Sequence, residues 1–351
     1  MQNATFLYTR VRSLLRLTVV VALFATVLPA HRLDAQQAQT ALENEVRADL
    51  SFLASDEMHG RGSSTRDEHI AALYAAAQFK ALGLEPGGDT GDYIQRVPVA
   101  LSERALKRVE KFEDTPRAET WNAVAILRGS DPKLREEVVL LTAHIDHLGM
   151  LKPGDGDRIY NGADDDASGT AAVLALAHVL ATGPAPKRTV VFALFGSEEL
   201  GGYGNAGFLK NPPAPLKNIV ANLEFEMIGR PDSAVPAGTL WLTGFERSTL
   251  GPELAKHGAR LVQDPHPTEH FFERSDNIAL ARQGIIAHTV SSFGLHKDYH
   301  QPSDEISTID FAHMARAIYS MEGPVQWLAN SDFRPQWNPN GRPEPPAARR
   351  P

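Results

Sequence analysis

The segment Val-Val-Leu-Leu-Thr-Ala-His-Ile-Asp-His (residues 138–147) decides the fold of this 351-residue chain, because it joins an apolar run to two histidines and an aspartate. An apolar run without polar alternation is typical of a strand that is buried on both faces. Similar runs follow, separated by helical stretches, and this alternation predicts an α/β sheet covered by helices on both faces. Ligands bind such sheets at the carboxyl ends of the strands, where the polar residues of this segment stand.

The same patterns predict the other elements of one domain over residues 36–330. The expected strands are Ala123 to Leu127, Val138 to Ala143, Thr189 to Phe195, Ile219 to Phe225, Leu240 to Leu242 and Ile285 to Val290. The expected helices are Thr170 to Ala181, Leu250 to His257, Asn277 to Gln283 and Phe311 to Leu328, the last interrupted at Pro324. Two earlier helices are expected to begin with capping boxes, Thr40 with Glu43 and Thr65 with Glu68, and Gly83 ends the second.

Composition excludes several kinds of site. The formal net charge is −8, and no cluster of Lys and Arg is evident, which disfavours a nucleic-acid partner because phosphates need clustered cations. The chain has no cysteine. Thiol catalysis, thiolate metal sites and disulfides are therefore excluded, and a metal site would have to use His, Asp and Glu.

The two ends of the chain differ from the rest. Arg10, Arg12 and Arg16 precede the apolar run Leu17 to Ala30, which is the layout of a secretory signal. This run is shorter than the roughly 20 residues that span a bilayer as a helix. We therefore expect a signal peptide over residues 1–35 and an exported chain, periplasmic or secreted, that has no membrane anchor after cleavage. Residues 331–351 are rich in Pro, Arg and Asn, which predicts a disordered tail.

Polar segments at the expected strand ends and in the loops carry the candidate chemistry. They are residues 142–147, 161–169, 196–199, 224–227 and 299–304. Carboxylates that meet at the ends of buried strands would repel one another unless a cation lay between them. His and carboxylate donors without cysteine suit zinc, and manganese or cobalt fits the same donors. Two His and three carboxylates exceed the needs of one catalytic zinc and suit two metals about 3.5–4 Å apart that share a carboxylate.

The order and wording of these segments resemble the co-catalytic zinc aminopeptidase family, which also includes glutaminyl cyclases. The resemblance runs from about Leu50 to Asp310, and it includes the early segments 51–61 and 83–89. It implies the zinc exopeptidase fold, a mixed, mostly parallel central sheet with helices on both faces. It also implies a two-zinc exopeptidase, with an aminopeptidase that hydrolyses N-terminal residues from peptides as the leading expectation.

The resemblance also implies a ligand set. Asp165 holds the aspartate position of the motif Gly-Ala-x-Asp-x-Ala-Ser-Gly (162–169) and would bridge the two metals. His144 and Glu226 would complete one metal site, and Glu199 and His300 the other.

Three further roles follow from the same resemblance. Glu198 would be the catalytic base that takes a proton from the metal-bound water and returns it to the departing amine. Asp146 would accept a hydrogen bond from the far nitrogen of His144 and so fix the tautomer of that ring. The hydroxyl of Tyr299 would help to stabilise the oxyanion.

One ligand departs from the family pattern. The family most often has aspartate directly before Met227, where this chain has Glu226. Glu224 is the nearby rival, because alternation along a strand directs both side chains to one face. The family position favours Glu226.

Several alternatives stay open. A carboxypeptidase of the same family needs a cation for the terminal carboxylate of its substrate, and Arg230, Arg274 and Lys297 are the candidates. A glutaminyl cyclase uses one zinc, against which the five-ligand set argues. A non-catalytic binding module on this fold would typically have lost ligands or the base. Aromatic residues near the strand ends either pack in the core or line a side-chain pocket; they are Trp241, Phe245, Phe271, Phe272 and Phe293.

Overall fold

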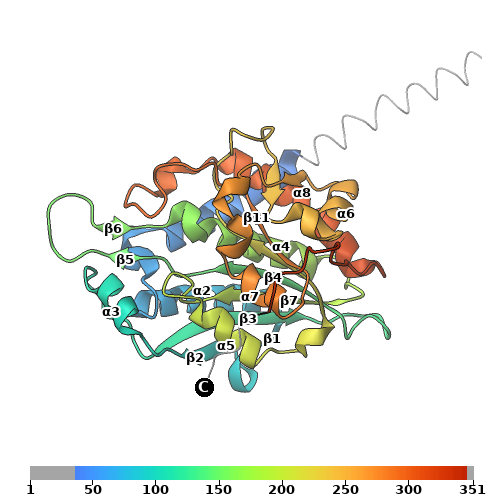
Figure 1. The fold of residues 1–351 in the computed structure, drawn as a ribbon, viewed down its shortest axis with the longest axis horizontal. Coiled ribbons are helices and arrows are strands. Elements are labelled where there is room, and N and C mark those ends of the chain that lie inside the picture. Colours follow the sequence, from blue (N-terminus) through green and yellow to red (C-terminus); the bar gives the residue numbers. More distant parts are fainter. Residues whose placement is uncertain (1–35, 346–351) are drawn as a thin grey trace, which may run out of the picture.

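The computed structural model describes residues 36–345, and its centre is a mixed sheet of nine strands. The strand order is β1-β3-β7-β4-β8-β11-β9-β10, with β2 paired to β3 (Figure 1). The β7-β4-β8-β11 centre of this sheet is parallel, and antiparallel pairs flank it on both sides. The mixed, mostly parallel sheet expected from the sequence is confirmed.

The strands and helices have the following bounds. The strands of the large sheet are β1 Glu85–Pro86, β2 Ile94–Pro98, β3 Glu119–Leu127, β4 Val138–His144, β7 Thr189–Phe195, β8 Ile219–Phe225, β9 Leu240–Leu242, β10 Leu261–Gln263 and β11 Ala287–Ser291. A separate pair, β5 Gly149–Met150 and β6 Ile159–Tyr160, projects from one side of the molecule (Figure 1). The helices are residues 36–53, α2 Arg66–Ala81, α3 Glu103–Val109, α4 Gly169–Thr182, α5 Tyr203–Lys210, α6 Leu250–Lys256, α7 Asn277–Arg282 and α8 Phe311–Asn330. Short turns are η1 Asp56–Arg61, η2 Asp89–Gly91, η3 Ala163–Ser168, η4 Leu216–Asn218, η5 Phe245–Arg247, η6 Pro267–Glu269, η7 Phe271–Glu273 and η8 Ile306–Thr308.

Helices cover both faces of the sheet because its central strands are apolar on both sides. In β4, Val139 and Leu141 belong to a core cluster that includes side chains of α2, α4 and α8. Val138 and Leu140 belong to a second cluster with side chains of α5 and α7. Strict alternation along β4 thus divides its residues between two cores. This explains why the sequence shows a continuous apolar run there.

The first expected helix start is wrong. The helix already includes residue 36, and the hydroxyl of Thr40 donates to the carbonyl of Gln36, 2.9 Å away, from inside the helix. A hydroxyl within a helix turns back on the preceding turn in this way and caps nothing. For the second helix, α2, the expected N-cap is confirmed, because the hydroxyl of Thr65 accepts from the backbone N–H of Asp67 at 3.2 Å. Glu68 does not close that capping box.

Two later expectations also need correction. Helix α8 continues through Pro324 to Asn330, and the residues beyond the proline keep the helix packed because Val325 and Leu328 are fully buried. Residues 331–345 are ordered against the domain. In that segment the indole N–H of Trp337 donates to a backbone carbonyl at 3.2 Å, and Arg334 pairs with Glu137 at 2.6 Å. Aromatic packing of Phe333 and Trp337 and backbone hydrogen bonds of Gln336 add to these contacts, so the segment is ordered although its composition predicts disorder.

The predicted signal peptide over residues 1–35 lies outside the described residues, as do residues 346–351 of the expected tail. Export is therefore still a prediction. In the described part of the chain, each helix is too short or too polar to cross a membrane.

A buried histidine makes stability depend on pH. In His288, Nδ1 lies 2.7 Å from the carbonyl of Thr243 and Nε2 lies 2.7 Å from the hydroxyl of Ser248, an arrangement that fits the neutral ring. Burial lowers the pKa of His288 to about 4. Below pH 6.5 the unfolded chain binds this proton more readily than the folded chain, so stability is lost as pH falls from 6.5 towards 4.

We expect metal-free protein to lose about 3 kcal/mol of unfolding free energy over this pH range through His288 alone. Urea unfolding at pH 6.5, 5.0 and 4.0 measures the loss. The His288→Gln variant lacks the titrating ring and should lose less over the same range. If the free energy of unfolding falls equally with pH in the two proteins, His288 does not cause the effect.

Candidate metal centre

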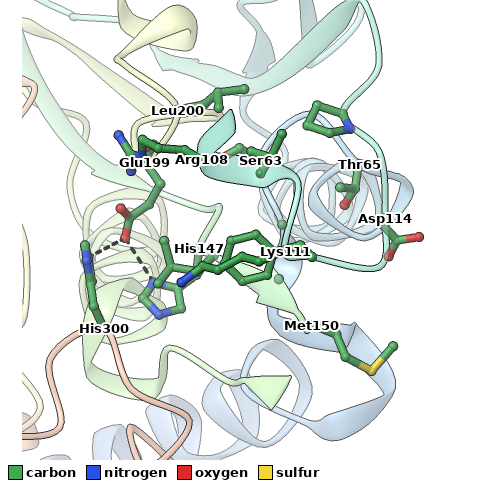
Figure 2. Close-up of a pocket in the computed structure, with 16 residues that line it drawn as sticks. Ser63, Thr65, Arg108, Lys111, Asp114, His147, Met150, Glu199, Leu200 and His300 are labelled. Atoms are coloured by element: carbon green, nitrogen blue, oxygen red, sulfur yellow. Dashed lines mark hydrogen bonds and ion pairs between the residues drawn. The ribbon is translucent and has the colours of Figure 1, made fainter. Parts of the chain in front are cut away.

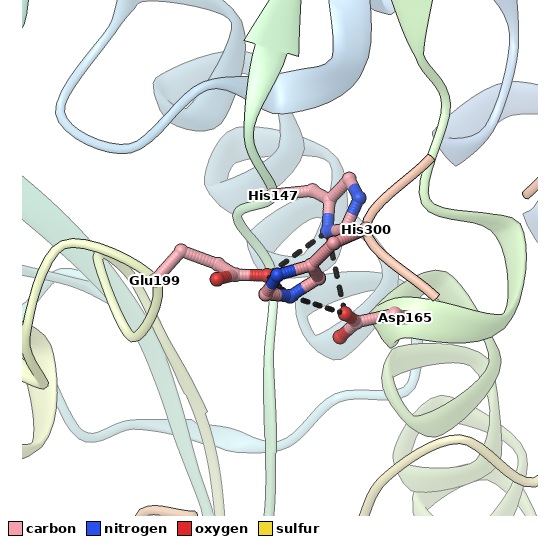
Figure 3. A group of neighbouring side chains, drawn as sticks. All are labelled: His147, Asp165, Glu199 and His300. Carbon is pink, nitrogen blue, oxygen red and sulfur yellow. Dashed lines mark ion pairs between the residues drawn. The ribbon is translucent and has the colours of Figure 1, made fainter. Parts of the chain in front are cut away.

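The polar segments named from the sequence meet at one edge of the sheet. Strands β7, β4 and β8 are parallel neighbours, so their carboxyl ends lie at the same edge. The turn η3 and the loop before α8 add Asp165 and His300 to this edge. Figure 3 shows four of the side chains converging from separate segments of the chain.

One group of donors contains His147, Asp165, Glu199 and His300, and their ligand atoms lie within 4.8 Å of one another. His300 Nε2 is 2.8 Å from Glu199 Oε1 and 3.1 Å from Asp165 Oδ2. His147 Nδ1 is 3.1 Å from that Glu199 oxygen and 3.7 Å from that Asp165 oxygen. His147 is not among the ligands expected from the sequence. The signal was its place in the same His-Ile-Asp-His segment as His144.

A second group contains His144, Asp165 and Glu226, again within 4.8 Å. His144 Nε2 lies 3.1 Å from Asp165 Oδ1. The two oxygens of Asp165 therefore face different groups, Oδ1 towards His144 and Oδ2 towards His300. A carboxylate that faces two sets of donors in this way is what a bridging ligand requires.

These atoms fit zinc. The buried atoms His144 Nε2, His147 Nδ1, Asp165 Oδ2 and Glu199 Oε1 have no hydrogen-bond partner within residues 36–345. Buried polar atoms normally have partners, and one cation in each donor group would account for all of them. Zinc bonds of 2.0–2.1 Å to nitrogen and oxygen place neighbouring tetrahedral donors roughly 3.3 Å apart. The separations in the two groups, from 2.8 to 3.7 Å, lie around this value.

The charges of the group agree with a cation site. Burial alone would raise the pKa of Asp165, but His147, His144 and His300 hold it well below its usual range. Burial and Asp165 also oppose ionisation of Glu199, yet His147 and His300 lower its pKa to about 2. Burial favours the neutral ring of His300, but Asp165 and Glu199 raise its pKa to about 10. Protons on the rings of His144 and His300 thus supply positive charge that a metal would replace on binding.

The neighbours of Asp165 organise the backbone. Asp164 accepts from the N–H of Gly229 at 2.8 Å, and Asp166 accepts from the N–H of Met227 at 3.1 Å. Both bonds fix the segment that follows β8, which carries Glu226. Asp164 and Asp166 are thus engaged with the backbone and belong to neither donor group.

Asp304 ties the bridging residue to the loop before α8. Its carboxylate accepts from the N–H groups of Asp164 and Asp165, both at 3.0 Å. The same loop carries Tyr299 and His300, so these hydrogen bonds set where His300 stands relative to Asp165. Asp304 is not among the site residues expected from the sequence.

The carboxylate of Asp146 lies farther from His144 than the expected hydrogen bond requires. The Nδ1 atom of His144 lies 3.1 Å from the backbone carbonyl of Asp146 and 3.7 Å from its carboxylate, which is too far for a hydrogen bond. The carboxylate instead accepts from the Ser63 hydroxyl at 2.6 Å and from the N–H groups of Glu198 and Glu199 at 3.0 and 3.2 Å. Asp146 therefore positions the two glutamates, and the backbone orients the ring.

Glu198 and Tyr299 lie beside the donor groups without belonging to them. Burial raises the pKa of Glu198 well above its usual range, and the nearby His144 opposes this while Glu226 adds to it. Bound divalent cations would lower it again. The Tyr299 ring stacks on His300 with centroids 3.9 Å apart.

Glu226 rather than Glu224 joins a donor group. Glu224 is fully buried, and neither carboxylate oxygen has a partner within the described residues. Burial, with Asp276 and Glu226 nearby, raises the pKa of Glu224 well above its usual range. Burial thus favours the neutral form of Glu224.

A buried arginine links the segments that carry the site. Arg61 is fully buried, and its guanidinium donates to the carbonyls of Ile145, Asn161 and Gly162 at 2.9, 2.7 and 2.9 Å and also to that of Leu53. These carbonyls belong to the first helix, the His144 segment and the loop before Asp165. The resemblance in segment 51–61 includes this residue, but its role needed the tertiary structure.

Two pockets flank the metal centre. The first has a volume of about 260 Å³; His147, Glu199 and His300 lie at one end of it, and Arg108 and Lys111 also line it (Figure 2). The second is lined by Glu226 and by aromatic and apolar side chains, which are Met227, Trp241, Phe271, Phe293 and Tyr299. Of the five aromatic residues named from the sequence, Trp241, Phe271 and Phe293 line this pocket, whereas Phe245 and Phe272 pack against the core.

Comparison with known proteins gives a family match. The model described as peptidase family M28 matches residues 122–321. Leucine aminopeptidase 1 of Ajellomyces capsulatus (strain NAm1 / WU24) is 28% identical over 240 residues, which cover 64% of this chain and 60% of that protein. A protein of Leptosphaeria maculans named as a probable zinc metalloprotease is 40% identical over 175 residues, 50% of this chain and 37% of the relative.

A solved structure supports the fold. BSAP, a zinc aminopeptidase from Bacillus subtilis, aligns with a TM-score of 0.61 at 16% identity, covering 83% of this chain and 96% of that one. At this identity the likeness concerns the fold alone. This chain spans about 60% of the length of the leucine aminopeptidase that it matches.

Proposed function

The chain belongs to peptidase family M28, and from this premise we propose that it is an exported two-zinc aminopeptidase that releases N-terminal residues from peptides. The observation that carries the proposal is the pair of donor groups that share Asp165, one oxygen facing each group. Manganese or cobalt fits the same donors.

The metals and Glu198 would divide the chemistry. Bound zinc lowers the pKa of a coordinated water towards about 7 and polarises the carbonyl of the substrate. Glu198 accepts the proton of the attacking water and gives it to the departing amine. Asp146 supports this role because it fixes the backbone N–H of Glu198 at 3.0 Å. Tyr299, beside His300, would donate to the oxyanion.

The two pockets suggest how a peptide lies across the site. The aromatic pocket suits an apolar N-terminal side chain, and Glu226 in its lining offers a carboxylate for the free amino group. The remainder of the peptide would extend into the first pocket, past Arg108 and Lys111. This arrangement favours an aminopeptidase with an apolar preference.

A carboxypeptidase is the second candidate, because one arginine lies in the aromatic pocket. Arg274 lines that pocket, although it also pairs with Glu269 at 3.4 Å. Arg230 is less suitable, because its guanidinium pairs with Asp298 at 2.8 Å. A single-zinc cyclase and a non-catalytic binding module fit less well, since five expected ligands are present and lie in two groups.

A peptide screen tests the proposal. We expect cleavage of leucyl and phenylalanyl peptides with free amino termini, no cleavage of the N-acetylated forms, and at least a 10²-fold loss of rate after chelation. Added zinc should restore the rate. Cleavage of N-acetylated peptides that needs a free carboxyl terminus would favour the carboxypeptidase instead, and activity unaffected by chelation would exclude a metal mechanism.

A further inference from the structure

We propose that His147 is a fourth protein ligand of the metal held by Glu199 and His300, so that the two metal sites are unequal. One site would be closed by four side chains, and the other, at His144 and Glu226, would have three and stay open. The inference rests on the proposed two-metal function and specifies which ion is held firmly.

The imidazole of His147 is buried without a hydrogen bond in the described part of the chain. The residue is fully buried, and neither ring nitrogen has a hydrogen-bond partner within residues 36–345. Its Nδ1 nevertheless lies 3.1 Å from Glu199 Oε1 and 3.7 Å from Asp165 Oδ2. These are the two oxygens that His300 Nε2 approaches at 2.8 and 3.1 Å. The two imidazoles and two carboxylates thus direct one atom each at a common point (Figure 3).

The ring of His147 is also held in place by its surroundings. The backbone N–H of His147 donates to the carbonyl of Arg61 at 3.0 Å, and its carbonyl accepts from the N–H of Ser63 at 3.2 Å. Gly162 packs on the ring so closely that a Cβ there would stand 2.6 Å from the ring carbon Cγ of His147. Gly162 also has a φ of +59°, which favours glycine. A ring fixed in this way suits a ligand, which needs a set geometry.

The number of donors decides the consequence. Structural zinc sites have four protein ligands, whereas catalytic sites have three and keep a position for water or substrate. The group with His147 offers four donors, and the group with His144 offers three. The ion at His147 would therefore bind first and tightly. The ion at His144 and Glu226 would exchange more readily and hold the position for water.

Cobalt titration of the metal-free protein tests this without measuring activity. We expect two bound Co²⁺ per chain with affinities at least tenfold apart, and the first should give the intense visible absorption of a tetrahedral ion. Because loss of a residue that merely supports a ligand costs 10–100-fold in metal affinity, His147→Ala should weaken the first ion by at least about tenfold. The intense absorption should also be lost. His144→Ala should weaken the second ion and leave the first spectrum unchanged, and His313→Gln, a buried histidine away from the donor groups, should change neither.

Each contrary result has a distinct meaning. Two ions of equal affinity, or a His147→Ala protein with the wild-type first spectrum and affinity, would overturn the role of His147 and leave the two-metal proposal standing. Fewer than two ions in the wild-type protein would overturn both. If His147→Ala does not fold, the donors of the first metal can be counted by X-ray absorption of the wild-type protein loaded with one equivalent of zinc. Four donors including two imidazoles support the inference, and a single imidazole overturns it.

Discussion

The Glu198→Gln variant is expected to keep both metals and to lose about 10³-fold in kcat, within the 10²–10⁴-fold range that general acid–base catalysis contributes. Glutamine has the shape of glutamate but cannot accept the proton of the attacking water. The backbone bond from Glu198 to Asp146 does not involve the side chain, so the turn should keep its geometry. Steady-state kinetics on a leucyl peptide, with zinc content per chain, measures both effects.

Glu224→Gln is the matched control for this variant. Glu224 is buried close to the site, and because burial favours its neutral form, glutamine resembles it in charge and in shape. We expect its kcat to lie within about threefold of wild type. Wild-type turnover in Glu198→Gln on every cleaved peptide would mean that another group is the base.

Replacing Arg61 by methionine is expected to lower the free energy of unfolding by about 3–5 kcal/mol, because several buried carbonyls lose their shared donor. Methionine fills much of the space but leaves the carbonyls of Ile145, Asn161 and Gly162 without donors. Each unpaired buried group costs about 1–3 kcal/mol. Urea unfolding of the metal-free protein measures the loss.

Two further variants separate the causes. Arg61→Lys keeps a charge but lacks the planar fork of donors, so an intermediate loss is expected. Arg66→Met removes an arginine whose side chain is 68% exposed and should change stability by less than about 0.5 kcal/mol. If the urea midpoint of Arg61→Met equals that of wild type, the guanidinium does not brace the site.

The central strands could be predicted from the sequence because their signal is local. Strands β7 and β8 have the expected bounds, and β4 extends one residue further, to His144. A strand buried on both faces needs apolar side chains at every position, so a continuous run is sufficient evidence. The start of the first helix and the order of residues 331–345 could not be predicted in this way. They depend on the neighbours against which these segments pack.

The sequence by itself determined the chemistry of the donors. It has no cysteine, and it places His, Asp and Glu at the ends of apolar strands, where parallel pairing must gather them. The five expected ligands do lie in two groups that share Asp165. Only the tertiary structure decided which atoms meet. His147 joins the Glu199 group, and the Asp146 carboxylate accepts hydrogen bonds from the N–H groups of Glu198 and Glu199. Arg61 donates to carbonyls up to 101 positions away along the chain. Such contacts depend on the conformation of the loops and on how segments far apart in the sequence pack together. A local pattern of residues encodes neither.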